Sequence, residues 1–265
     1  MKIFSLETNA IFIVVAALIL AAFLAFSSNA FSQTNSEEVE EQNGQFRYIY
    51  GDELTREKAN SVISHLEQNY SKVMSGLMVP ELPTVTVRLW TSYESLYSAQ
   101  YERSGQRFEG SAGSVWWSTE GGPEILAVYN ERYEGMRQHT ASLLHEFAHL
   151  VSMAINPSIP NNPRWLWESV AIYEAGEYRA NLSGIDYIAS RDFPTLAELD
   201  VGFNEANQAR NIYQVGFTIA EYIVETWGAE GLISLVKRNG NILSTFGIST
   251  SEFESGWQAH LEGKL

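Results

Sequence analysis

The chain has 265 residues, of which 45% are apolar and 12% aromatic, which is enough for one substantial hydrophobic core. Its 32 acidic residues outnumber the 17 basic ones and give a net charge of −15, so nucleic acid and anionic membrane surfaces are poor partners. The absence of cysteine excludes disulfides, thiolate metal ligands and a cysteine nucleophile, so any metal must be held by histidine and carboxylate side chains.

The N-terminus has the composition of an export signal. Lys2 precedes an almost purely apolar run over residues 10–26. Ser28 and Ala30 then place small residues at the two positions that a signal peptidase reads. We expect residues 1–30 to be a signal peptide; the alternative is a single N-terminal membrane anchor, because the run is just long enough to span a bilayer. The protein is therefore expected to be secreted, periplasmic, or tethered to the outer face of the cytoplasmic membrane.

A polar, acidic segment separates this leader from the rest of the chain. Residues 31–45 carry no apolar periodicity, which predicts a disordered spacer. The folded part is therefore predicted to begin near Phe46 and to form a single domain over residues 46–265.

The first half of this domain mixes helical and strand patterns. Apolar residues recur at three- and four-residue steps from Thr55 to Leu77, which predicts an amphipathic helix with Thr55 as its N-cap. Strands are predicted at residues 84–90, 114–117 and 125–129, and a short helix at residues 92–101. A turn at Gly121-Gly122-Pro123 is expected to precede the last of these strands.

The second half is predicted to be helical. Helices are expected at about residues 137–156, 163–178, 213–227, 230–239 and 250–261. Pro157 and Pro160 end the first of these helices, because proline has no amide hydrogen to continue it. Strands early in the chain and helices late in it indicate an α+β fold.

The segment His145-Glu146-Phe147-Ala148-His149 carries the clearest chemical signal. Side chains four positions apart leave the same face of a helix with a rise of about 6 Å, so both imidazoles can reach one metal ion. Glu146 projects about 100° away from His145, where it can hydrogen-bond a water on the metal without being a ligand. The alternative is a pair of histidines that simply pack in a buried helix.

A zinc ion held by two histidines needs a third protein ligand and an open position for water. The best candidate is Glu168, which lies on the next predicted helix with 18 residues between it and His149. An antiparallel helix pair joined by the proline-rich bend at residues 156–163 would return this carboxylate to the metal face.

The spacing and the segment Trp165-Leu166-Trp167-Glu168-Ser169-Val170-Ala171-Ile172-Tyr173 resemble the gluzincin clan of zinc metallopeptidases, in particular its peptidase MA-like families of exported bacterial proteins. The resemblance extends over about residues 84–262. It implies a zincin-like catalytic domain in residues 46–265, with a small N-terminal mixed sheet whose edge strand lies over the HExxH helix, followed by a helical lobe. Ser169 stands where a glycine is usual after the glutamate ligand.

The resemblance implies zinc-dependent hydrolysis of a peptide or protein substrate. By position, His145, His149 and Glu168 would hold Zn²⁺, and Glu146 would be the general base that activates the metal-bound water. Tyr213 is the candidate donor to the oxyanion, with packing in the helical lobe as its alternative role.

Two observations bear on the rest of the site. The helical face of Glu168 carries Ala171 and Ala175 but no carboxylate to orient a metal-bound imidazole. This gap motivates the alternative function, a catalytically inactive zincin-fold binding or scaffold protein at the cell surface. Strand 125–129 could be the edge strand that pairs with an extended peptide, with a core strand as its alternative. Trp116 and Trp117 could line a substrate groove or pack in the core.

Overall fold

The computed structural model describes residues 38–51, 53–129, 137–176, 181–201 and 210–265, with the backbone alone for residues 137–142. The predicted export signal at residues 1–30 lies outside these ranges. In the ranges that are described, no helix combines the length and the apolar character needed to cross a membrane.

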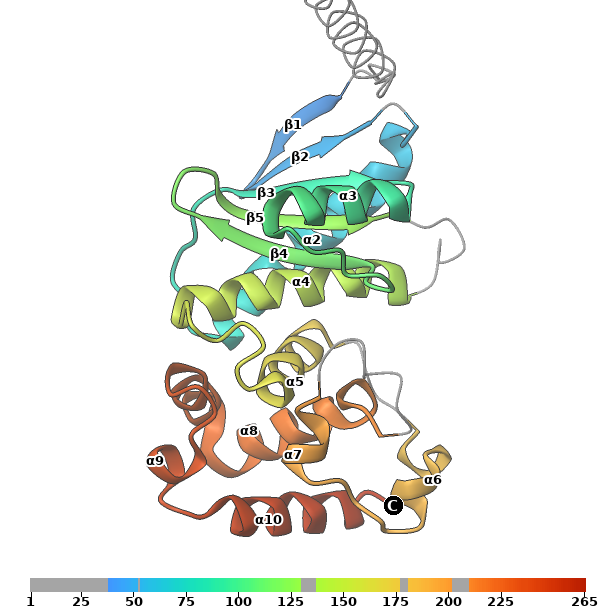
Figure 1. Cartoon of the computed structure of the whole chain (residues 1–265). Helices are drawn as coiled ribbons and strands as arrows, with labels where there is room; N and C mark the ends of the chain where they lie inside the picture. The colour runs from blue at the N-terminus through green and yellow to red at the C-terminus, as the bar shows by residue number, and fades with distance from the viewer. Residues whose placement is uncertain (1–37, 52, 130–136, 177–180, 202–209) are drawn as a thin grey trace, which may run out of the picture. The chain divides into compact units, whose positions relative to one another are not determined.

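Five strands within the described residues form one mixed sheet in the order β1-β2-β3-β5-β4 (Figure 1). Their bounds are Val39–Asn43 for β1, Phe46–Tyr50 for β2, Val85–Trp90 for β3, Gly113–Ser118 for β4 and Gly122–Val128 for β5. Strands β2, β3 and β5 run parallel, whereas β1 and β4 pair antiparallel at the two edges. The predicted α+β class with a small mixed sheet is confirmed.

The helices that the sequence predicts are all present, and α6, α7 and α9 are short additions. The bounds are Arg56–Gly76 for α2, Tyr93–Ser104 for α3, Arg137–Ile155 for α4, Arg164–Ala175 for α5, Asp186–Ala189 for α6, Leu196–Leu199 for α7, Ile212–Lys237 for α8, Ile242–Phe246 for α9 and Thr250–Glu262 for α10. Gly228 interrupts α8 with a φ of 72°, so the helices predicted at residues 213–227 and 230–239 are present as two helical segments that meet at a kink. Thr55 caps α2 as predicted, because its side chain accepts a hydrogen bond from the backbone N of Lys58.

Different helices cover the two faces of the sheet (Figure 1). Side chains alternate between the faces of a strand, so Ile125 and Ala127 of β5 join the main core with α2 and α4. Leu126 and Val128 of the same strand join a smaller core with α3 on the opposite face. Helix α4 also contacts β4, so the helix with both histidines runs beside the edge of the sheet.

Residues 31–45 are predicted to be disordered, and this prediction is wrong for Val39–Asn43. These residues form strand β1, which pairs with β2. Most residues of β1 are exposed, and surface ion pairs such as Arg56 with Glu41 at 3.4 Å accompany its backbone hydrogen bonds. A strand without a buried face leaves no apolar alternation in the sequence, so nothing in the pattern distinguishes it from a polar spacer.

The edge strand beside α4 is β4, and the prediction that residues 125–129 form this edge is wrong. Strand β5 pairs with β3 on one side and with β4 on the other, so its backbone is enclosed. The chain reverses direction after Ser118, whose Oγ accepts a hydrogen bond from the backbone N of Gly121 at 2.7 Å. The order of strands along the chain does not determine their order in the sheet, and here the hairpin places the earlier strand outside the later one.

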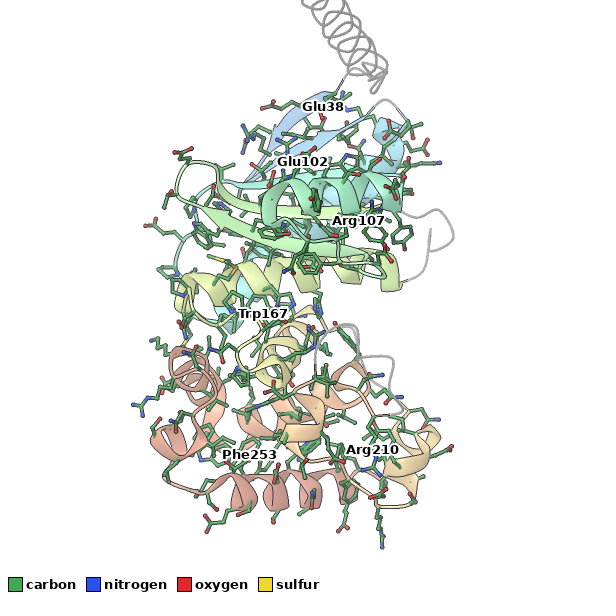
Figure 2. The ribbon with its side chains drawn as sticks, in the orientation of Figure 1. Glu38, Glu102, Arg107, Trp167, Arg210 and Phe253 are labelled. Atoms are coloured by element: carbon green, nitrogen blue, oxygen red, sulfur yellow. The ribbon has the colours of Figure 1, made fainter. Side chains whose placement is uncertain are left out.

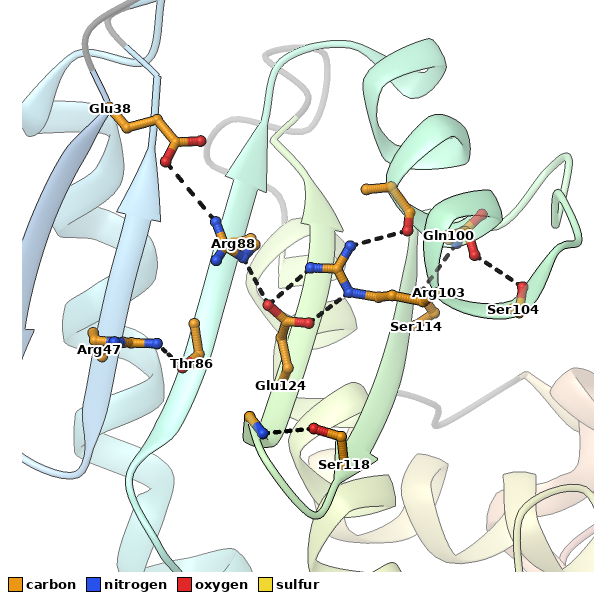
Figure 3. A network of polar contacts seen from close by, with 12 residues as sticks. Glu38, Arg47, Thr86, Arg88, Gln100, Arg103, Ser104, Ser114, Ser118 and Glu124 are labelled. Carbon is orange, nitrogen blue, oxygen red and sulfur yellow. Dashed lines mark hydrogen bonds and ion pairs between the residues drawn. The ribbon is translucent and has the colours of Figure 1, made fainter.

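A partly buried carboxylate fastens α3 to the sheet. Glu124 of β5 accepts hydrogen bonds from Arg88 Nε at 2.7 Å and from Arg103 Nε at 2.6 Å (Figure 3). Burial raises the pKa of Glu124, but the hydrogen bonds and charges of the two guanidinium groups outweigh it and leave this pKa below its usual value. Strands β3 and β5 and helix α3 are thereby joined.

Helix α5 carries a buried carboxylate, Glu174, that is 6% exposed. It lies against Gly76 at the end of α2, where an added Cβ would come within 2.2 Å of a carboxylate oxygen. Burial raises the pKa of Glu174 to about 7, although the positive charge of Lys72 lowers it in part. The protonated form of Glu174 is therefore the form that the folded protein favours.

We expect the raised pKa of Glu174 to make the free energy of unfolding fall as the pH rises. Its contribution is fully present below the ordinary pKa of 4.5 and is lost as the pH rises through about 7. From pH 5 to pH 8 the free energy of unfolding should therefore decrease by about 2 kcal/mol less in Glu174→Gln than in the wild type. Urea unfolding at the two pH values measures both decreases.

The matched control is Glu230→Gln, because Glu230 is exposed on α8. This control should follow the pH dependence of the wild type. Equal pH dependence for Glu174→Gln and the wild type would show that burial of Glu174 does not govern this part of the stability.

Candidate metal centre

Three side chains from two helices meet at one point. His145 and His149 come from α4, and the Oε2 atom of Glu168 on α5 lies 3.2 Å from His145 Nε2 and 3.7 Å from His149 Nε2. Each of the three residues is at most 8% exposed. One ligand atom from each lies within 4.8 Å of the others, so the group could hold a metal ion. The structure thus brings together the three residues that the sequence predicts as ligands.

The start of α5, one turn before Glu168, is capped by a residue far along the chain. The N-cap residue Pro163 makes no side-chain capping hydrogen bond. Asp200 supplies the cap instead: its Oδ1 accepts from the backbone N of Arg164 at 2.6 Å and of Trp165 at 3.4 Å. The negative charge of a carboxylate at the N-terminus of a helix also interacts favourably with the positive end of the helix dipole.

The imidazole of His149 is held neutral. Burial lowers its pKa well below the usual value, and the charges of His145 and Arg164 lower it further. A neutral imidazole is the form that binds a metal. Its Nε2 faces Glu168, whereas its buried Nδ1 has no hydrogen-bond partner among the described residues.

The ring plane of His149 is set by an aromatic neighbour. The indole of Trp167 stacks on the imidazole with ring centroids 3.8 Å apart and an angle of 6° between the planes. Trp167 immediately precedes Glu168 on α5, beside α4 (Figure 2). In the sequence, the helical face of Glu168 carries no carboxylate to orient a metal-bound imidazole. In the structure, the imidazole of His149 stacks on Trp167 instead.

Glu146 lines the same cavity as the three candidate ligands and does not belong to the group that could hold a metal ion. Its carboxylate occupies space next to Gly113 at the start of the edge strand β4. A Cβ added to Gly113 would come within 2.8 Å of both Cγ and Oε1 of Glu146. The absence of a side chain at this position is therefore what allows the carboxylate to lie between α4 and β4.

Arg164 belongs to the site, although sequence reasoning did not identify it. Its guanidinium is buried and its Nη2 lies 2.9 Å from Oε1 of Glu168. The same nitrogen donates to the hydroxyl of Tyr213 at 2.8 Å, and Nη1 donates to Oδ1 of Asn161 at 3.0 Å. The signal available in the sequence was the spacing, since a residue four positions before a helical carboxylate lies on the same face.

These side chains line a cavity of about 870 Å³ that lies along β4 and the starts of α5 and α8. Its aromatic wall is formed by Phe108, Trp116, Trp117, Trp167 and Tyr213. Trp117 also packs against the main core and Trp116 against the core beneath α3, so the predicted core packing is confirmed for both, while a role in binding substrate stays a prediction. The cavity combines apolar aromatic surface with a small number of buried polar groups, as ligand sites commonly do.

Tyr213 lies at the same cavity, at the start of α8. Burial raises its pKa, the charge of Glu168 raises it further, and the hydroxyl therefore stays protonated. Its predicted role as an oxyanion donor remains a prediction.

A scan against models of protein families found no match to this chain, and a search of the curated proteins found no match either.

We expect Trp167→Leu to weaken metal binding by about 10-fold, because the imidazole of His149 would lose the surface that fixes its plane. Trp167→Phe should retain most of the affinity, since a phenyl ring can still stack. Competition with a chromophoric zinc chelator measures both, with circular dichroism to show that each variant is folded.

Trp117→Leu serves as the control, because Trp117 lines the cavity from β4 and is not the stacking partner of His149. It should match the wild type in the same competition assay. Wild-type affinity in the folded Trp167→Leu variant would show that stacking does not position His149.

Proposed function

We propose that this protein is an exported zinc metallopeptidase of the gluzincin type, which hydrolyses a peptide bond in a peptide or protein substrate. The observation that carries the proposal is the convergence of His145, His149 and Glu168 at one cavity, with Glu146 beside them. Two imidazole nitrogens and one carboxylate oxygen, without sulfur, form a donor set typical of catalytic zinc. The resemblance of the motif segment to gluzincins supports the same assignment, and the apolar leader supports export.

The residues of the site fit the steps of such a hydrolysis. Zinc, when bound, lowers the pKa of a water molecule and polarises the carbonyl of the substrate. Glu146 would take the proton from the attacking water and pass it to the leaving amine. Tyr213, protonated in its buried position, would donate a hydrogen bond to the oxygen that becomes negative.

The edge strand supports a substrate that is an extended peptide. Antiparallel pairs alternate between hydrogen-bonded and non-hydrogen-bonded positions, and the backbone N of Val128 donates to the O of Ala112 at 3.0 Å. Counting from that pair, Val115 and Trp117 direct their backbone N–H and C=O groups away from β5. No other described strand pairs with this side of β4. A peptide lying there would add to the sheet next to Glu146.

The central experiment combines a metal assay with hydrolysis of a mixed peptide library, read by mass spectrometry with and without a chelator. We expect one zinc ion per chain and cleavage that the chelator stops. Glu146→Gln should lower cleavage by at least about 100-fold while zinc stays bound, because it removes the general base and not a ligand.

The two possible failures have different meanings. A wild-type protein that holds zinc but cleaves no peptide would favour the alternative, an inactive zincin-fold binding or scaffold protein. A protein that holds no zinc would remove the basis of the proposal. Retained cleavage in Glu146→Gln would show that Glu146 is not the base.

Gly113 offers a second test of the base. The methyl group of Gly113→Ala should push the Glu146 side chain aside, because it would lie 2.8 Å from the present position of Oε1. We expect at least about 10-fold slower cleavage with zinc content unchanged, since misplacing a catalytic group is costly for the rate. The melting temperature should change little, because the displaced atoms belong to the Glu146 side chain and not to the backbone.

The control is Gly184→Ala, at a position where an added methyl group meets nothing closer than 3.6 Å. This variant should cleave peptides as the wild type does. Unchanged cleavage in Gly113→Ala would indicate that the present position of Glu146 is not the one used in the reaction.

A further inference from the structure

Arg164 contacts two groups of the site through one nitrogen. It is the first residue of α5, one helical turn before Glu168, and it is 6% exposed. Its Nη2 lies 2.9 Å from Glu168 Oε1 and 2.8 Å from the hydroxyl oxygen of Tyr213. The guanidinium also lies near the ring of Tyr213, with Cζ 5.7 Å from the centroid. A metal-ligand candidate on α5 and a tyrosine on α8 are thereby joined.

The contact with Arg164 gives the two oxygens of Glu168 different partners. Oε1 faces the guanidinium, whereas Oε2 faces Nε2 of His145 at 3.2 Å and Nε2 of His149 at 3.7 Å. A carboxylate with one oxygen held in this way can present the other oxygen to a metal. Without that ion pair, rotation of the carboxylate would allow either oxygen, or both, to face the ion.

Arg164 is itself held in place by the surrounding chain. Its Nη1 donates to Asn161 Oδ1 at 3.0 Å, in the bend between α4 and α5. Its backbone N donates to Asp200 Oδ1 at 2.6 Å. A planar guanidinium can contact a carboxylate, a hydroxyl and an amide at the same time, whereas the ammonium of a lysine cannot reproduce this geometry.

We propose that Arg164 is a positioning residue of the metal centre, which restricts Glu168 to one coordinating oxygen and places the hydroxyl of Tyr213 at the cavity. The role assigned to Tyr213 rests on the proposed function. The role assigned to Glu168 depends on metal binding alone. Arg164 has no need to touch the substrate in this role.

The test compares Arg164→Met and Arg164→Lys with the wild type by zinc affinity and by the visible absorption of the cobalt-substituted protein. We expect Arg164→Met to lower the zinc affinity by about 10- to 100-fold and to shift the cobalt bands, because the number and geometry of the oxygen ligands change. Arg164→Lys should give an intermediate affinity, since it keeps the charge but loses the planar fork.

Two control variants distinguish the contact of Arg164 with Glu168 from its contact with Tyr213 and from a general effect of removing an arginine at the cavity. Arg107 also lines the cavity but pairs with Glu94 at 2.6 Å, so Arg107→Met should match the wild type in both metal readouts. Tyr213→Phe should keep the zinc affinity and the cobalt spectrum while lowering kcat more than KM changes. Circular dichroism would show that each variant is folded.

The outcomes distinguish this inference from the proposed function. Wild-type zinc affinity and an unchanged cobalt spectrum in folded Arg164→Met would overturn the positioning role, whatever the activity. A wild-type protein that binds zinc but cleaves no peptide would refute the proposed function, while the two metal readouts would still decide the role of Arg164.

Discussion

The contact between α4 and α5 buries two imidazoles, a carboxylate and a guanidinium in an otherwise apolar interface. Burying such groups is unfavourable unless each meets a partner, and breaking one pair would leave a charge without compensation. Glu168 meets Arg164 through one oxygen and both histidines through the other. A shift of α5 by one turn, about 5.4 Å, would separate these groups. Apolar packing and electrostatics therefore select the same register of the two helices.

Helix α8 supports this register from the other side of α5. An added Cβ at Gly216 would lie 3.2 Å from Ser169 Oγ and 3.0 Å from Ile172 Cδ1, so the two helices cross closely. The hydroxyl of Ser169 is buried and donates to the backbone O of Trp165 at 2.6 Å. Ser169 is thus accommodated by a glycine on the facing helix.

Among the described residues, the imidazole of His149 stacks on Trp167 and makes no hydrogen bond to a carboxylate. Stacking restricts rotation of the ring but accepts no proton, so it orients Nε2 without raising its basicity. The charge in the site comes from Glu168 and Arg164 on α5 and from Glu146 on α4. These side chains converge on the cavity at the edge of the sheet, where Gly113 leaves room for Glu146.

The sequence alone determined what depends on neighbours within one or two helical turns. Apolar periodicity located the long helices, and the four-residue spacing put His145 and His149 on one face. The choice of Glu168 required one further assumption, that the next helix folds back, and the structure agrees with it. These features are local, so the order of residues carries them.

Only the tertiary structure decided which surfaces meet. The exposed strand β1 depends on backbone pairing with β2, and the outer place of β4 depends on the pairing of β5 with β3, a strand distant in the sequence. Such pairing leaves no apolar pattern in the sequence. The stacking of Trp167 on His149, the sharing of Arg164 between Glu168 and Tyr213, and the space beside residue 113 arise where separate elements pack together. Such contacts depend on how whole helices and strands are placed, because packing is a property of facing surfaces and not of neighbouring residues.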